Sequence, residues 1–444
     1  MIRGYRLHRS HLPGDVVASP APKASLPGPD DILRRVLPNG IIVLARENWS
    51  APSVVVEGYL LAGNLDEPAG LPGLASFVAG MLSRGTTRHT FAEISETIEG
   101  LGASIGFGPD RQAISFSTKS LAEDLDTVLG LLAEELRMPA FPTEYIERVR
   151  GMRLTALAER ENDTRQMAGR AFRELMYGKH PLGRDMLGTR ESLAAIQRES
   201  LVGFYEQFFR PQGMVVAVVG ALKAEEAVRR VEEAFGDWSG QRPARPALDP
   251  LRPLTGVRRR HVVMADKSQS DIIMGWHGLR RLDEEYDAAR LANTVLGVFG
   301  MMGRLGANVR ERQGMAYYAY SHMSGDRERG TWLAIAGVNP ANVQRAQAAM
   351  LDEIRRLQDE LVPEDELQDS KRFLVGSLPL QLETNDGVAS LLVDLEWHQL
   401  GLDYLWRYEH LIEGVTAAQV QAVSRRYLDP TRYIVAIAGP ETEG

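Results

Sequence analysis

An internal repeat is the feature that most constrains how this chain can fold. Residues 208–220 read FFRPQGMVVAVVG and residues 427–439 read YLDPTRYIVAIAG. The prolines Pro211 and Pro430 lie 219 residues apart, and with that offset the two apolar runs align without a gap and both end in glycine. Such a long period indicates one supersecondary unit used twice. The alternative is a chance similarity between two helix–strand ends.

A proline-rich segment separates the two copies. Four prolines fall within residues 240–256, a density that neither a helix nor an interior strand tolerates. We therefore predict an N-terminal domain at 32–239, a linker at 240–256 and a C-terminal domain at 257–440. A proline-rich N-terminal arm at 1–31 precedes them.

Each half mixes strand and helix patterns. A helix is predicted before each repeated run, and it opens at a short polar residue, Ser200 in the first copy and Thr416 in the second. Apolar residues at helical spacing predict equivalent long helices over 121–136 and 343–361. Residues 145–177 are predicted to form a long helical region. The chain is thus expected to contain one α/β unit used twice.

Composition excludes several classes of protein. The net charge of −8 argues against a nucleic-acid binder. The absence of cysteine rules out disulfides, thiolate metal sites and a cysteine nucleophile. No apolar run reaches the roughly 18 residues of a membrane span, and the N-terminus has no apolar core typical of a signal peptide. We predict a cytoplasmic protein that does not bind membranes.

The chain shows no self-contained catalytic motif. Its nine histidines are scattered, and there is neither a nucleophile elbow nor a phosphate-binding loop. The segment 74–86, LASFVAGMLSRGT, predicts a helix with one apolar stripe and a second face of small residues. Three of those small residues, Ser76, Ala79 and Gly80, have the i, i+3, i+4 spacing that places side chains next to each other.

A family resemblance emerges from the order of several motifs. LPNGIIVLARE, GYLLAGNLDEPAGLPGLASFVAGMLSRGT, KHPLGRDMLGT, FFRPQGMVVAVVG, NVRERQGMAYYAYS and YLDPTRYIVAIAGP follow one another over residues 32–440. Together they resemble the pitrilysin / mitochondrial processing peptidase family of zinc endopeptidases. The resemblance implies an α+β fold: two repeated α/β sandwich domains, each a mixed, largely antiparallel sheet with helices packed on it. It also implies a clamshell with a partner subunit.

The zinc motif of that family is degenerate here. SFVAGM aligns with its H-F-x-E-H-M motif, so that Ser76 and Gly80 stand at the two histidine ligands and Ala79 at the general base. The third ligand, a glutamate, falls at Ala156, and the nearby Glu159 is expected at the surface. Imidazole and carboxylate groups bind zinc, whereas these residues do not replace them. We expect no metal in this chain and no independent peptidase activity.

The second half retains a different motif of the family. VRERQGMAYYAYS resembles R-E-x-x-G-x-A-Y, which places its arginine at Arg310 and its tyrosine at Tyr317. In the family both side chains contact the substrate backbone and polarise the scissile carbonyl, as hydrogen-bond donors can. LGVFGMMGRL resembles the accompanying glycine-rich loop and marks Gly300 and Gly303 as substrate-binding positions. The alternative for the pair is an ordinary salt-bridged arginine and a packed tyrosine.

This combination resembles the non-catalytic subunit of a heterodimeric zinc metallopeptidase. The resemblance implies a partner of the same family that carries the zinc, with Arg310 and Tyr317 acting in trans on a peptide that lies along an edge strand. An isolated chain could form a homodimer. A catalytically inert scaffold homologue is the second hypothesis, and a self-sufficient peptidase is the third. The sequence does not identify the partner or the substrate.

Overall fold

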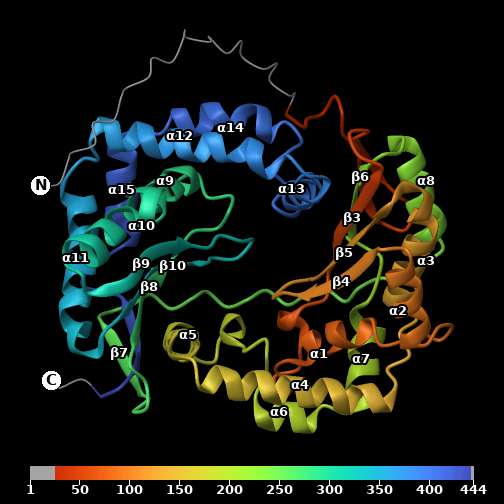
Figure 1. Cartoon of the computed structure of the whole chain (residues 1–444), viewed down its shortest axis with the longest axis horizontal. Coiled ribbons are helices and arrows are strands. Elements are labelled where there is room, and N and C mark those ends of the chain that lie inside the picture. The colour runs from red at the N-terminus through yellow and green to blue at the C-terminus, as the bar shows by residue number, and fades with distance from the viewer. Residues whose placement is uncertain (1–25, 442–444) are drawn as a thin grey trace, which may run out of the picture.

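Two halves, each built on one sheet, make up the computed structural model, which describes residues 26–441 (Figure 1). The predicted arm therefore lies mostly outside the described residues. Its last part, beginning at Leu26, rests on the C-terminal half, where the Trp406 indole donates a hydrogen bond to the Leu26 carbonyl (3.2 Å). Among residues 26–441 no helix combines the length and apolar character that a membrane crossing requires.

The N-terminal half contains a six-stranded sheet in the order β1-β2-β6-β3-β5-β4. Only β2 and β6 run parallel, and every other neighbouring pair is antiparallel. The strands are β1 (Leu33–Val36), β2 (Ile42–Glu47), β3 (Ser53–Leu60), β4 (Ser104–Pro109), β5 (Ile114–Leu121) and β6 (Val215–Gly220).

The C-terminal half contains a five-stranded sheet in the order β7-β11-β8-β10-β9. Here β7 and β11 form the parallel pair. The strands are β7 (Arg258–Val263), β8 (Ser270–His277), β9 (Ala316–Met323), β10 (Thr331–Val338) and β11 (Ile434–Gly439).

The repeat predicted from the sequence is confirmed by the two sheets. The repeated runs form β6 and β11, which hold the same place in their sheets, between the parallel neighbour and the next antiparallel strand. Both strands are buried along their whole length, as their continuous apolar sequence requires. The predicted fold of two α/β units with mixed, largely antiparallel sheets is therefore correct.

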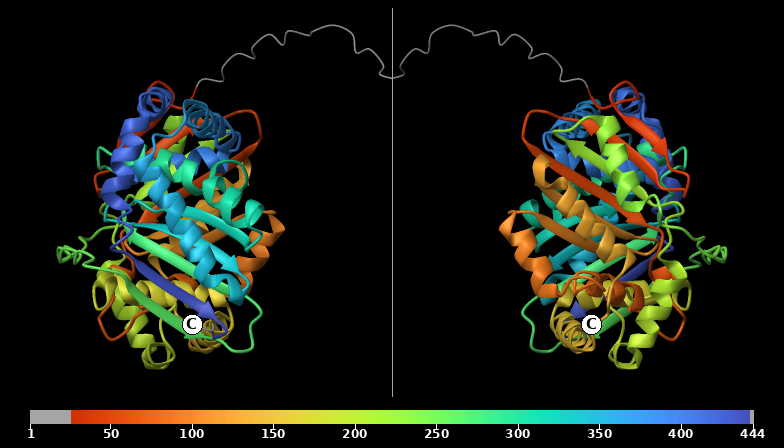
Figure 2. Two further views of the ribbon diagram at one scale, coloured as in Figure 1. Left: turned by 90° about the vertical axis from the view of Figure 1, so that its left-hand side faces the viewer. Right: turned by 90° about the vertical axis from the view of Figure 1, so that its right-hand side faces the viewer.

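Helices cover both sheets. In the N-terminal half they are α1 (Leu74–Leu82), α2 (Phe91–Gly100), α3 (Leu125–Arg137), α4 (Thr143–Glu161), α5 (Thr164–Tyr177), α6 (Arg190–Ala195), α7 (Arg198–Phe208) and α8 (Ala224–Phe235). In the C-terminal half they are α9 (Tyr286–Gly297), α10 (Phe299–Leu305), the π-helix η4 (Gly306–Arg312), α11 (Val343–Asp359), α12 (Glu364–Gln381), α13 (Asn385–Trp397), α14 (Tyr404–Glu413) and α15 (Ala417–Tyr427). Side views show α3 and α8 outside the first sheet and α11 outside the second (Figure 2).

One helix prediction is confirmed in more detail and another needs correction. The predicted helical region 145–177 consists of two helices, α4 and α5, which separate where the Asp163 side chain accepts a hydrogen bond from the backbone N–H of Gln166 (2.7 Å) and caps α5. Helix α7 starts at Arg198, two residues before the predicted Ser200. The predicted start at Thr416 is correct, since its side chain caps α15.

Each half sends one helix to the sheet of the other half (Figure 1). Helix α5 packs on β8 and β11, where Phe172 joins Ile273 and Ile434 in one apolar cluster. Helix α13 packs on β3 and β6, where Leu392 shares an apolar cluster with Val215. Each sheet is therefore covered on one face by a helix from the opposite half, so neither half is a closed unit.

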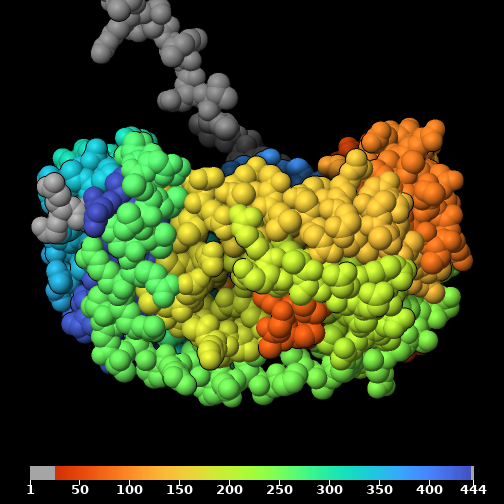
Figure 3. Space-filling view, turned by 90° about the horizontal axis from the view of Figure 1, so that it is seen from below, coloured from red at the N-terminus to blue at the C-terminus, as the bar shows by residue number. Residues whose placement is uncertain are grey.

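The two halves also meet through the loops between their strands. The Asp326 carboxylate, in the β9–β10 loop, accepts hydrogen bonds from Gln112 of the N-terminal half (3.1 Å) and from the Trp397 indole of α13 (2.7 Å). Residues 240–256 contain neither helix nor strand and cross between the halves along the outside of the molecule (Figure 3). There Arg245 pairs with the buried Asp66 (2.6 Å).

Candidate functional site

Helix α1 carries the degenerate zinc motif and is buried between its neighbours. Its backbone begins after Gly73, whose φ of +91° and close approach to Gly188 require glycine. Phe77 and Met81 are fully buried, as the predicted apolar stripe requires. The small face packs towards α4, and Ser76 and Ala79 are also buried there.

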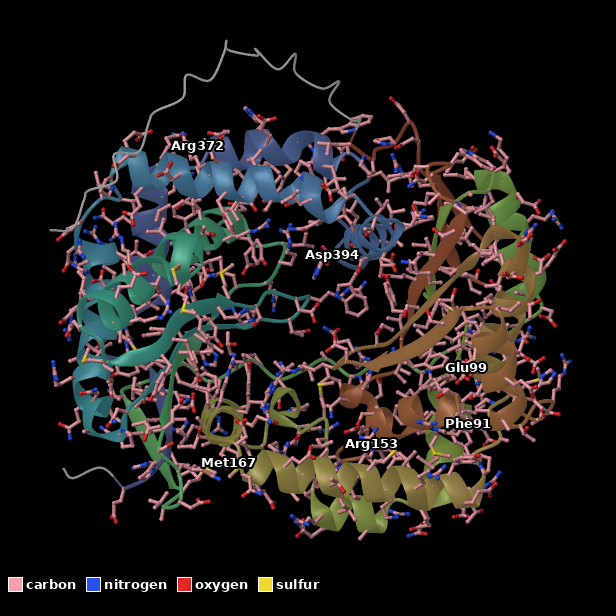
Figure 4. The ribbon with its side chains drawn as sticks, viewed as in Figure 1. Phe91, Glu99, Arg153, Met167, Arg372 and Asp394 are labelled. Atoms are coloured by element: carbon pink, nitrogen blue, oxygen red, sulfur yellow. The ribbon has the colours of Figure 1, made fainter. Side chains whose placement is uncertain are left out.

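The Arg153 guanidinium of α4 occupies the space beside the small residues (Figure 4). Its Nη1 donates to the Ser76 hydroxyl (2.9 Å), and its Nη2 donates to the Ser76 carbonyl. A Cβ atom built on Gly80 would lie 3.4 Å from Nη2. Arg153 therefore fills the volume next to both positions at which the family has histidine ligands.

Burial and a nearby carboxylate set the charge of this region. Desolvation lowers the pKa of Arg153 to about 10, so the guanidinium remains charged at neutral pH. Its side chain also stacks over the Phe77 ring, 5.3 Å from the centroid. Glu67 accepts hydrogen bonds from the N–H groups of Gly73 (3.2 Å) and Ala75 (2.8 Å) at the start of α1, although burial raises its pKa to about 8.

These residues do not fit a zinc ion. Ala156 lies on α4 one turn from Arg153 and provides a methyl group, whereas Glu159 is exposed on the outer side of the helix, as predicted. A fixed guanidinium repels a divalent cation, and the Ser76 oxygens are already engaged with it. Across residues 26–441 no three His, Asp or Glu side chains converge as a metal site would require.

Arg310 and Tyr317 lie on consecutive elements that contact each other, and neither side chain has a partner among residues 26–441. Arg310 belongs to η4, and Tyr317 belongs to β9, which follows after the positive-φ residue Gly314. Within the described chain neither side chain makes a hydrogen bond or ion pair, and Tyr317 is 66% exposed. The nearby Arg312, by contrast, forms an ion pair with the buried Glu353 (3.3 Å). The alternative interpretation of the motif, in which Arg310 forms a salt bridge and Tyr317 is packed, therefore does not describe these two residues.

The glycine-rich segment forms an irregular turn between α9 and η4. Gly300 and Gly303 have φ values of +61° and +58°, in the left-handed region. A Cβ on Gly303 would lie 2.6 Å from the Val295 carbonyl oxygen, so only glycine fits there, whereas Gly300 faces open space. The turn exposes Met301 beside a cavity of about 340 Å³ that Gly303 also lines.

The two candidate regions are far apart within this chain. Helix α1 lies in the N-terminal half, while α10 and β9 lie in the C-terminal half (Figure 1). Strand β9 is the edge strand of its sheet, and within residues 26–441 it pairs with β10 alone. The structure therefore does not bring the Arg310 and Tyr317 region together with the degenerate zinc motif.

Sequence reasoning missed Arg153. The only available signal was its position three residues before Ala156 on the same predicted helix, which puts both on one face. Nothing in the residue pattern distinguished it from the neighbouring arginines Arg148 and Arg150. The contact depends on how α4 is placed against α1.

Sequence comparison places known peptidase models along the chain. The model described as insulinase (peptidase family M16) matches residues 42–190, and the model described as peptidase M16 inactive domain matches residues 195–374. An uncharacterized zinc protease of Streptomyces coelicolor is 28% identical over 92% of this chain and 90% of its own length. A probable mitochondrial-processing peptidase subunit beta of Arabidopsis thaliana is 24% identical over 91% of this chain and 77% of its own length.

Solved structures show the same fold. A peptidase M16 inactive domain from Pseudomonas fluorescens superimposes with a TM-score of 0.87 and 24% identity, covering 93% of this chain and 98% of that one. A protease from Helicobacter pylori gives a TM-score of 0.86 and 19% identity, covering 94% of this chain and all of that one.

Proposed function

We propose that this chain, which belongs to peptidase family M16, is the non-catalytic subunit of a heterodimeric zinc metallopeptidase. In this proposal a partner of the same family supplies the zinc, and Arg310 and Tyr317 act in trans on the bound peptide. The observation that carries it is that Arg310 and Tyr317 are hydrogen-bond donors without partners among the described residues. In the same chain, Arg153 fills the space beside the degenerate zinc motif.

The proposed role of the pair is hydrogen bonding to the peptide backbone. The Tyr317 phenol is exposed and the Arg310 guanidinium is half-buried without a partner among the described residues, so both can donate to carbonyl oxygens of a substrate held between two subunits. Donors aimed at the scissile carbonyl stabilise the negative charge that develops on its oxygen in the transition state. The edge position of β9, which carries Tyr317, supports a peptide that binds as an added strand.

The glycine-rich turn is proposed to contact the same peptide. Its exposed Met301 offers a flexible apolar surface, and its backbone approaches closely because Gly303 has no side chain. The cytoplasmic location stays a prediction, as do the identity of the partner and of the peptide.

The test reconstitutes the enzyme from two chains. The purified chain is mixed with a family member that carries an intact H-x-x-E-H helix, and hydrolysis of a quenched fluorescent peptide is followed. Arg310→Ala and Tyr317→Phe should each lower kcat/KM by about tenfold or more, in line with the loss of one transition-state hydrogen bond. Arg355→Ala, which removes an exposed arginine of α11, is the control.

The second hypothesis, an inert scaffold, predicts a different result. A scaffold would associate with the partner, but both variants would then hydrolyse the peptide at the unmodified rate. Analytical ultracentrifugation of the same mixtures separates a loss of association from a loss of catalysis.

A further inference from the structure

A polar cavity in the C-terminal half has no role in the proposed function. It encloses about 300 Å³ between α9, α12, α13, α14 and the β9–β10 loop. Asp394, on the side of α13 that faces this half, is at its rim (Figure 4). The polar lining includes Arg281, Arg290, Tyr286, Tyr404, Tyr408 and His398.

Two guanidinium groups in this cavity are held by aromatic rings instead of carboxylates. Arg281 lies 4.4 Å from the centroid of Tyr286 and donates a hydrogen bond to the Tyr404 hydroxyl (2.7 Å). Arg290 lies 5.3 Å from the centroid of Tyr408. In the part of the chain that the structure describes, neither arginine forms an ion pair. Stacking uses the face of a guanidinium and leaves N–H donors at its edge for another acceptor.

Buried polar groups complete the lining. Burial raises the pKa of Tyr408 to about 12, so its hydroxyl keeps its proton at neutral pH. His398 is 8% exposed and its Nε2 lies 3.3 Å from Asp394, but its buried Nδ1 has no partner among the described residues. A buried nitrogen without a partner is costly unless water or a ligand meets it.

Two guanidinium groups and one carboxylate line the cavity. Asp394 is that carboxylate; it is half exposed and engaged with His398. Asp287 of α9 is not part of the lining, although it is close enough to Tyr408 to contribute to the raised pKa of that phenol. Two guanidinium groups therefore face one carboxylate across a space large enough for a small molecule.

We propose that this cavity binds a small molecule through an oxyanion group, a phosphate or a carboxylate, which accepts hydrogen bonds from Arg281 and Arg290. Planar guanidinium groups match the geometry of both anions. The lining of the cavity comes from this chain, so its test uses the isolated chain and does not depend on the proposed peptidase role. The backbone N–H of Arg281 also donates to the Asp326 carbonyl (2.9 Å), which places the site directly behind the contact between the halves.

Titration of the isolated full chain tests the site. Inorganic phosphate and acetate are titrated separately by calorimetry at constant ionic strength, and thermal unfolding is measured in parallel. Saturable binding of either anion at millimolar concentration or below is expected, and Arg290→Gln should weaken it about tenfold, as loss of a charge-assisted hydrogen bond does. Arg372→Gln, on the exposed side of α12, is the matched control (Figure 4).

Each outcome decides the proposal. Phosphate binding alone identifies a phosphate-bearing ligand, and binding of acetate as well extends the class to carboxylates. No saturable binding of either anion, or the same affinity in Arg290→Gln as in Arg372→Gln, would overturn it. If Arg290→Gln does not fold, Arg290→Lys keeps the charge, and the NMR shift of the His398 ring reports the anion in the unmodified chain.

Discussion

The Arg153 guanidinium donates hydrogen bonds to both the hydroxyl and the carbonyl oxygen of Ser76, and so ties α4 to α1. Ser76 is the position of the first zinc ligand in the family motif, and α4 carries the position of the third. A positive charge on a side chain thus lies where the family would hold a metal cation between the same two helices. In this chain the two helices are therefore joined by a direct hydrogen-bonded contact.

Replacing Arg153 should destabilise the chain. Arg153→Ala removes two hydrogen bonds to the buried Ser76, one to its hydroxyl and one to its carbonyl, which costs about 1–3 kcal/mol in the free energy of unfolding. Urea denaturation followed by circular dichroism measures it. Arg148→Ala, an exposed arginine on the same helix, should change stability by less than about 0.5 kcal/mol. Equal effects in the two variants would show that the contact is not formed in solution.

Glu135 should make stability depend on pH. Its carboxyl is fully buried without a partner among the described residues, and burial raises its pKa to about 8 from 4.5. The folded chain therefore holds a proton that the unfolded chain has lost, so the stability of the folded state falls as pH rises from about 5 to 8.

The Glu135→Gln variant isolates this effect. The amide cannot ionise, so the variant should gain stability over the parent as pH rises, by roughly 1–3 kcal/mol at pH 8. Glu67, whose pKa is raised in the same direction, is present in both chains and cancels in the comparison. A constant difference in melting temperature between pH 5 and pH 8 would contradict the prediction.

Asp326 should hold the two halves together. Asp326→Ala removes the acceptor for Gln112 and Trp397, and we expect a loss of about 1–3 kcal/mol with faster amide exchange in the β9–β10 loop. Hydrogen exchange with mass spectrometry measures the loop directly. Asp352→Ala, which breaks an exposed pair within α11, should leave that exchange unchanged.

Arg310 and Tyr317 should contribute nothing to the stability of the isolated chain. Neither side chain has a partner within the described residues, so Arg310→Ala and Tyr317→Phe should shift the free energy of unfolding by less than about 0.5 kcal/mol. Tyr318→Phe on the same strand should be clearly destabilising, because the Tyr318 hydroxyl donates to the buried Asp271 carboxylate. A large loss in the Arg310 or Tyr317 variant would indicate a structural role instead of a functional one.

Much of the fold could be predicted because its signals are local. Proline and glycine positions around Pro211 and Pro430 marked the repeat, and continuous apolar runs marked the two buried strands. The residue types at Ser76 and Gly80 are sufficient to identify a motif without metal ligands, because neither side chain can replace an imidazole. The break at Asp163 also had a local signal, because aspartate is a common capping residue at the start of a helix.

The sequence by itself determined the two α/β units, the loss of ligand chemistry on α1 and the retained Arg310 and Tyr317 motif, since these follow from residue identity and spacing. Only the tertiary structure decided that α5 and α13 each pack on the sheet of the other half. It also decided that Arg153 fills the space beside Ser76 and Gly80, and that Asp326 links the two halves. Periodicity shows which face of a helix is apolar, but not which sheet will cover it. A long arginine side chain can reach several partners, and only the placement of α4 against α1 selects Ser76.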